Sequence, residues 1–257
     1  MAKSKKNTGA GAGGVTAERR ATLERMRAEE RSKARRRTAL MVAPALVLAV
    51  VVGVMVFVQF QQASKPKPDA LSAIGVPASA AGCQDVVTKK AEGNQDHRPE
   101  GQSITYTTNP PAAGPHWGQF LFGGQVRKFW TAEDRPPLER LVHSLEHGYT
   151  ILWYDDTVAA DAKQVDALKK LADVFAGSSL SDKFMAAPWT AKDTKERGSD
   201  FPSGTHVALT HWSMGGTHGN PDGQLGIWQY CGKVSGPVVS SFMKDYPYSD
   251  SPEPQAG

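Results

Sequence analysis

The longest hydrophobic segment of the chain runs from Thr38 to Phe60 and contains no charged residue. A helix of this length crosses roughly 30 Å of hydrocarbon, the thickness of a bilayer core. Residues 38–60 therefore predict one transmembrane helix. The small residues Ala78-Ser79-Ala80 resemble a signal-peptide cleavage site, but they lie too far from this run, which is also longer than a signal-peptide core of about 7–15 residues. We expect an uncleaved anchor.

After residue 82 the pattern changes to short strand-like and helix-like segments. Runs rich in β-branched and aromatic residues predict strands over 103–109, 125–130, 149–155, 206–212 and 224–230. Apolar positions at helical spacing predict helices over 159–176 and 235–245, with a shorter one between Pro137 and Gly148. The polar, proline-containing stretch 181–205 predicts a mobile loop. We expect an α+β domain with a mixed or mainly antiparallel sheet and two or three packed helices.

These patterns divide the chain into five parts. In order, they are a basic cytoplasmic segment (1–37), the transmembrane helix (38–60), a linker rich in Pro, Ala, Ser and Lys (61–81), the exported α+β domain (82–246) and a flexible tail (247–257).

The distribution of charge orients the chain across the membrane. Residues 1–37 contain twelve Lys and Arg and four Glu, a net charge of +8, whereas the whole chain carries +4. The positive-inside rule places this N-terminal segment in the cytoplasm and the large C-terminal part outside the plasma membrane. The basic isoelectric point belongs to the cytoplasmic segment, and the remaining −4 argues against a nucleic-acid partner.

The only two cysteines, Cys83 and Cys231, both lie in the exported part. Thiols tend to pair in an oxidising compartment. We expect a disulfide that joins the start of the folded domain to its last strand, the alternative being two separate buried thiols.

The short helix carries a motif suited to metal binding. Its apolar positions share one face, and the opposite face carries Glu139, His143, Glu146 and His147. Two imidazoles four residues apart lie side by side on a helix, and imidazole is the commonest protein metal ligand. We expect His143 and His147 to hold a metal ion. Glu139 and Glu146 would either hydrogen-bond to the ligating histidines and orient them or act as a general base.

A second motif, PPAAGPHW, supplies a third imidazole. Pro110, Pro111 and Pro115 restrict the backbone around His116, which is how a rigid loop places a ligand at low entropic cost. Three histidines form a familiar zinc ligand set, and His97 is a candidate fourth ligand. The three-histidine set favours zinc as the expected ion. Copper is the alternative, because affinity alone generally favours copper.

Other interpretations of these residues stay open. His-x-x-Glu-His is the inverted zinc-protease signature with Glu146 as the base, but the helix is short and no later helix offers a convincing third carboxylate. His143 and His147 could instead cap the helix, and His116 could pack on an aromatic ring. His211 is explained by default as a buried, hydrogen-bonded neutral histidine, with a copper site beside Met214 and His218 as the alternative.

The combination of His97, the PP-x-x-GPH loop, the segment LVHSLEHG with its following strand YTILWY, and one anchor resembles an uncharacterised actinobacterial family of membrane-anchored domains. The resemblance covers nearly the whole exported domain, with Ala112-Ala113 where relatives commonly have Thr-Ser. It implies membership and a location in the cell envelope, and it implies no activity.

Three classes of function follow from the sequence. The leading hypothesis is a single-pass plasma-membrane protein whose extracytoplasmic domain binds a transition metal. The second is a metal-dependent hydrolase, and the third is an envelope scaffold or accessory subunit of a membrane complex, in which the histidines stabilise the fold.

Overall fold

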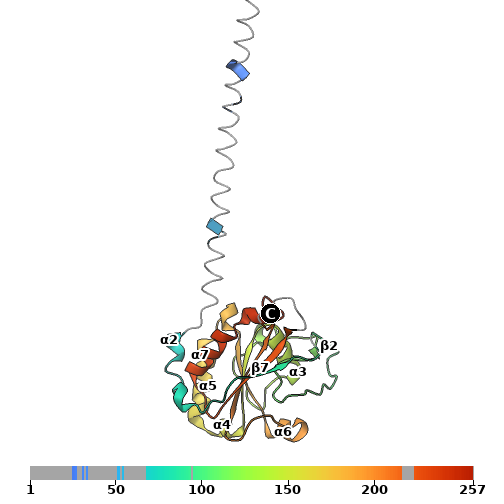
Figure 1. Ribbon diagram of the computed structural model, residues 1–257, viewed down its shortest axis with the longest axis vertical. Helices are drawn as coiled ribbons and strands as arrows, with labels where there is room; N and C mark the ends of the chain where they lie inside the picture. The colour runs from blue at the N-terminus through green and yellow to red at the C-terminus, as the bar shows by residue number, and fades with distance from the viewer. Residues whose placement is uncertain are drawn as a thin grey trace, which may run out of the picture. The chain divides into compact units, whose positions relative to one another are not determined.

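The computed structural model describes residues 25–27, 31, 33, 51, 52, 54, 68–93, 95–215 and 223–256 (Figure 1). The chain divides into two compact units, Met1–Phe60 and Gln61–Gly257. The basic segment 1–37 and the hydrophobic segment 38–60 fall almost wholly outside the described residues. Within the described part of the chain, no helix has both the length and the apolar character needed to cross a bilayer. The anchor therefore stays a sequence prediction.

A mixed five-stranded sheet forms the centre of the second unit, in the order β1-β7-β6-β4-β5. Its strands in chain order are β1 Val87–Lys90, β4 Thr150–Tyr154, β5 Phe184–Pro188, β6 Val207–Ser213 and β7 Leu225–Cys231. Neighbours are antiparallel except β4 and β5, which are parallel. The predicted α+β class with a mixed sheet is confirmed.

Both faces of the sheet are covered. Successive side chains of a strand point to opposite faces, so each strand contributes to the packing on both sides. On β4, Leu152 belongs to one hydrophobic cluster and Trp153 to another. The first cluster includes side chains of α5 (Ala162–Val174) and α7 (Gly236–Asp245), and the second includes those of α3 (Leu138–Glu146). In Figure 1, α5 and α7 lie on one side of the sheet and α3 on the other.

Short elements complete the unit. Among the described residues, the remaining helices are α2 Pro68–Leu71, α4 Asp156–Ala160 and α6 Ala191–Arg197, and the 3₁₀ turns are η1 Ala78–Ala80, η2 Gly123–Gln125, η3 Leu180–Asp182 and η5 Tyr248–Asp250. A separate two-stranded ribbon pairs β2 (His97–Arg98) in parallel with β3 (His116–Trp117), and it sets His97 opposite His116.

Among the predicted strands and the predicted loop, the structure differs from the sequence predictions in three segments. Residues 103–109 form no strand, and 125–130 contribute only one isolated bridge, between Phe129 and Ala186. The expected mobile loop 181–205 instead supplies β5 and α6. Every residue of β5 is buried beside β4, so its short apolar run shows no alternation, which is typical of a strand covered on both faces.

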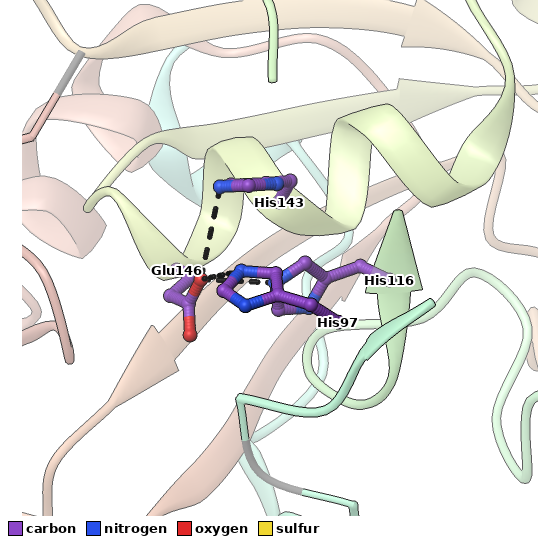
Figure 2. A group of neighbouring side chains, drawn as sticks. All are labelled: His97, His116, His143 and Glu146. Atoms are coloured by element: carbon purple, nitrogen blue, oxygen red, sulfur yellow. Dashed lines mark ion pairs between the residues drawn. The ribbon is translucent and has the colours of Figure 1, made fainter. Parts of the chain in front are cut away.

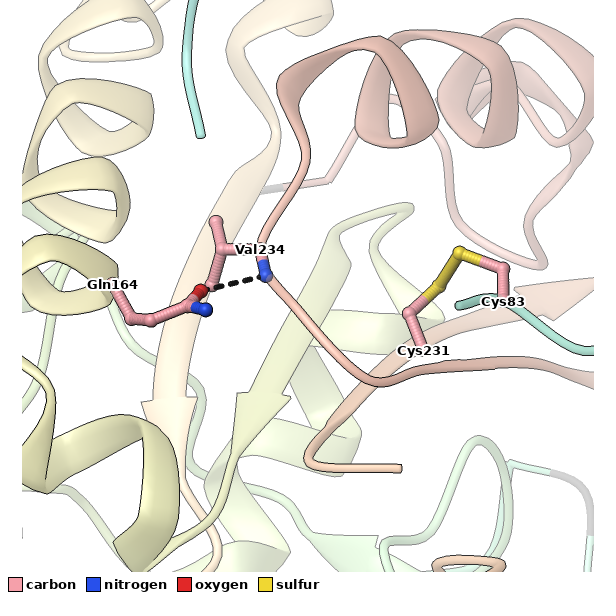
Figure 3. Close-up of a disulfide and its surroundings, with 4 residues drawn as sticks. All are labelled: Cys83, Gln164, Cys231 and Val234. Carbon is pink, nitrogen blue, oxygen red and sulfur yellow. Dashed lines mark hydrogen bonds between the residues drawn. A yellow bond between two sulfur atoms is a disulfide. The ribbon is translucent and has the colours of Figure 1, made fainter. Parts of the chain in front are cut away.

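Cys83 and Cys231 form the expected disulfide, which ties the chain before β1 to the end of β7 (Figure 3). Close to it, the amide of Val234 donates a hydrogen bond of 2.8 Å to the Gln164 side chain on α5. The last strand is therefore attached both to the start of the unit and to a helix on one face.

Candidate metal centre

The polar face of α3 lies against the β2–β3 ribbon, and this contact creates the candidate site. Helix α3 begins after Pro137 and ends at His147, where Gly148 takes a positive φ of 90°. The apolar side chains of α3 face the sheet within the second cluster. His143 then reaches the ribbon, where its Nδ1 lies 2.6 Å from the backbone oxygen of Trp117 on β3.

Three imidazoles and one carboxylate converge between the helix and the ribbon (Figure 2). Glu146 Oε2 lies 2.9 Å from His116 Nε2, 3.5 Å from His97 Nε2 and 3.9 Å from His143 Nε2. One ligand atom from each of the four residues lies within 4.8 Å of all the others. This spacing, with four donors around one point, is the arrangement that could hold a metal ion.

Hydrogen bonds outside the cluster orient two of the rings. His116 Nδ1 lies 2.9 Å from the backbone oxygen of Gly114, and His143 Nδ1 makes its contact with the oxygen of Trp117. Because a carbonyl oxygen only accepts, each Nδ1 carries a proton, and in the neutral ring each Nε2 then presents a lone pair to the cluster. Metal-binding histidines are commonly held in this way.

His143 and Glu146 are held in the forms that bind metal. Burial lowers the pKa of His143 to about 4, so its ring is neutral near pH 7. Burial acts to raise the pKa of Glu146, but its contact with His116 and the nearby His143 and His97 hold that pKa below its usual range. A neutral imidazole and an ionised carboxylate are the states that ligate a cation.

Several buried atoms of the cluster have no hydrogen-bond partner among the described residues. They are His116 Nε2 and both carboxylate oxygens of Glu146, and neither side chain has any exposed surface. His116 Nε2 and Glu146 Oε2 lie 2.9 Å apart. Buried polar groups without partners are costly, and a cation bound within the cluster would satisfy His116 Nε2 and Glu146 Oε2 together.

His97 occupies the open side of the cluster. Its side chain is 45% exposed, whereas those of His116, His143 and Glu146 are at most 4% exposed. The sequence offered it as a fourth ligand, and β2 places it in contact with Glu146. The buried trio therefore forms the base of the site, and His97 covers it on the solvent side.

The structure distributes the other predicted site residues differently. Glu139 lies seven residues before Glu146, about 10 Å along the helix axis, and pairs with Arg197 at 3.4 Å instead of supporting the histidines. Glu146 lies among the candidate metal ligands, with its carboxylate next to the Nε2 atoms, rather than outside them as an orienting group. His147 packs edge-on against His143, with ring centroids 4.5 Å apart, but belongs to a second group with Glu146 and Glu253.

The expected flexible tail packs against the domain. Tyr248 and Ser251 are buried, and the amide of Glu253 donates a hydrogen bond of 3.0 Å to the backbone oxygen of Glu146. The buried Lys183 donates to the backbone oxygens of His147, Pro254 and Ala256. The tail sequence is polar and rich in proline, so it gave no signal for these attachments, and Lys183 and Glu253 were both missed.

His211 is fully buried, as the sequence predicted. Burial lowers the pKa of His211 to about 4. The carboxylate of Asp250 and the backbone oxygens of Tyr149 and Asp250 act in the opposite direction and raise it, but burial has the larger effect. Met214 is buried, and His218, the third residue of the alternative copper site, lies outside the described residues.

The buried neutral His211 gives the metal-free protein a pH-dependent stability. Its pKa is about 4 when folded, against 6.5 for an unperturbed histidine, so the unfolded chain binds the proton first as the pH falls. Its contribution to stability is complete above pH 6.5 and decreases by about 3 kcal/mol as the pH falls to 4. Urea denaturation across this range should show a smaller decrease for His211→Leu than for the wild type, and equal decreases would contradict the assignment.

The fold and the site define a class: an α+β domain with a buried group of three histidines and one glutamate that could hold a metal ion. A family model described as "Protein of unknown function (DUF3105)" matches residues 97–257, more than half of the chain, so the chain belongs to that family. The matched region begins at His97 and contains the whole four-residue group and Glu253.

A second family model, described as "Inhibitor of host cell division protein domain", matches residues 17–75, which is less than half of the chain. No curated protein and no solved structure matches the chain.

Proposed function

We propose that this domain binds a transition metal ion through His97, His116, His143 and Glu146. One observation carries the proposal: three Nε2 atoms and a carboxylate oxygen converge at one place, where the oxygen and His116 Nε2 are buried and have no hydrogen-bond partner among the described residues. The backbone oxygens behind His116 and His143 support it, because they direct both lone pairs at the same point.

Zinc is the ion that we propose. Four protein donors, of which three are imidazoles, suit the tetrahedral coordination that zinc adopts in proteins. Copper is the competing ion, since similar donor sets generally bind Cu²⁺ more tightly than Zn²⁺. The two are distinguished by elemental analysis and by the paramagnetism of Cu²⁺.

The geometry favours a binding role over hydrolysis. In the inverted zinc-protease arrangement the two histidines of His-x-x-Glu-His bind the metal and the glutamate stays free to act on water. Here Glu146 contacts three imidazoles of the site, and His147 lies in a different group of donors. A carboxylate used as a ligand is not available as a general base.

We also propose that the domain is held outside the plasma membrane by the segment 38–60. The support is the length and apolar character of that segment, the basic residues before it and the disulfide between Cys83 and Cys231, which suits an oxidising compartment. An envelope location would also allow a protein partner in a membrane complex, and the negative charge after residue 37 argues against nucleic acid.

Metal content tests the binding proposal. The full chain would be purified without a histidine tag, from cells given no added metal, beside a His116→Ala, His143→Ala double variant and a His206→Ala control. His206 pairs with Asp155 at 2.8 Å and belongs to neither donor group, so it matches the substitution without touching the site.

We expect at least one ion per chain in the wild type and the control, and no site-bound ion in the double variant. A folded wild type that contains no metal and takes up neither zinc nor copper on dialysis would contradict the proposal. So would a folded double variant with as much metal as the wild type.

A further inference from the structure

We propose a second metal position beside the first, formed by Glu146, His147 and Glu253, so that Glu146 bridges two ions. This inference rests on the proposed function, because it requires an ion in the first position. It assigns a role to the C-terminal segment and to His147, neither of which the four-residue group uses. One ligand atom from each of the three residues lies within 4.8 Å of the other two.

The first argument concerns the free oxygen of Glu146. All three of its ion-pair contacts with His97, His116 and His143 are made through Oε2. In Figure 2 the dashed lines meet at one carboxylate oxygen, and the other points away from the three rings. Oε1 is buried and has no hydrogen-bond partner in the described part of the chain. The first site therefore leaves one buried acceptor of this carboxylate unsatisfied.

The second argument concerns His147, which ends the same helix. Glu146 lies three residues after His143 on the same side of the helix, and ligand atoms of Glu146 and His147 lie within 4.8 Å of each other. His147 is buried, with its Nε2 3.5 Å from Glu253 Oε2. Phe120 packs against both His143 and His147, with ring centroids 5.5 and 5.0 Å away, and covers the two positions with one aromatic side chain.

The third argument is that the structure holds Glu253 in place. Its amide is bonded to the backbone oxygen of Glu146, the same residue that would bridge the ions. Lys183 binds the backbone oxygens of His147 and of two residues just after Glu253, at 2.7 to 3.0 Å. A Cβ on Gly148 would lie only 2.7 Å from the backbone oxygen of Tyr248, so glycine permits the close approach of this segment.

The donor chemistry suits a pair of divalent cations. Two-metal sites in proteins place ions about 3.5–4 Å apart, and a carboxylate whose two oxygens bind different ions is suited to that spacing. Glu146 and Glu253 together supply two negative charges to offset the ions. Glu253 is 40% exposed, so the second position opens toward solvent and is expected to bind its ion more weakly than the first.

Zinc titration of the metal-free full chain tests this inference, with a chromophoric chelator as competitor. The wild type should bind two zinc ions per chain. A His147→Ala, Glu253→Gln variant should bind one, and a matched His206→Ala, Glu196→Gln control, altered at an exposed glutamate of α6, should bind two. Glu253→Gln alone changes a half-exposed side chain and should weaken the second ion at least about tenfold while it leaves the first unchanged.

The possible outcomes separate the two proposals. A wild type that binds one ion overturns the second position and leaves the proposed function standing, whereas a wild type that binds none overturns both. Two ions in the His147→Ala, Glu253→Gln variant would place the second ion elsewhere and overturn the inference. With Cu²⁺ as the probe, two ions that share Glu146 should give a magnetically coupled spectrum, and two independent copper signals would contradict the bridge.

Discussion

Removal of metal is expected to lower the melting temperature of the protein by roughly 10 °C. A ligand present at a thousand times its dissociation constant stabilises the folded state by about 4 kcal/mol, and each kcal/mol shifts the melting temperature of a domain of this size by about 2–4 °C. The effect should be large here, because the ion would occupy a buried place where His116 Nε2 and the Glu146 carboxylate otherwise have no hydrogen-bond partner among the described residues.

The measurement is thermal unfolding of the full chain with and without a strong chelator. The His116→Ala, His143→Ala variant should unfold at one temperature under both conditions, because it has lost the buried imidazoles. The His206→Ala control should respond to the chelator as the wild type does. If the chelator has no effect on a wild type shown to contain metal, the ion is not bound to the folded domain at this site.

Lys183→Met is expected to lower the free energy of unfolding by about 2–4 kcal/mol. The Lys183 ammonium donates to three backbone oxygens and is 3% exposed. Hydrogen bonds from a charged donor contribute about 1.5–3 kcal/mol each. Burial lowers the pKa of Lys183 to about 8, which records a desolvation cost that offsets part of this gain. Methionine keeps the length of the side chain and removes the donors.

Urea denaturation would measure this loss, with Lys192→Met as the control. Lys192 is 79% exposed on α6, so its replacement should change stability by less than about 0.5 kcal/mol. Carboxypeptidase digestion should also remove the last residues faster from Lys183→Met than from the wild type, because Pro254 and Ala256 lose their attachment. Equal stability and equal digestion would show that Lys183 does not hold the C-terminal segment.

The elements with strong periodic patterns could be predicted from the sequence. Strands β4, β6 and β7 and helices α3, α5 and α7 lie within two or three residues of their expected positions. Strand β5 could not be predicted, because its apolar run is short, contains a proline and lies within a mostly polar stretch. Its conformation depends on parallel pairing with β4, which is a tertiary contact that no local pattern records.

The residues of the candidate site likewise fall into those that a local motif predicts and those that only a tertiary contact brings together. His97, His116 and His143 were found because each belongs to a short motif with a recognisable chemistry. The direct role of Glu146 depends on where the β2–β3 ribbon crosses α3, and helix periodicity alone does not contain that information. Glu253 is 107 residues from Glu146 along the chain, and only the folded tail brings the two together.

The most direct test of the account is a crystal structure of the zinc-loaded protein with diffraction data collected on both sides of the zinc absorption edge. We expect an anomalous peak about 2.0–2.2 Å from the Nε2 atoms of His116 and His143 and from a Glu146 oxygen, with His97 as the fourth donor. A well-ordered site with no anomalous peak, in crystals that contain zinc elsewhere, would contradict the central claim.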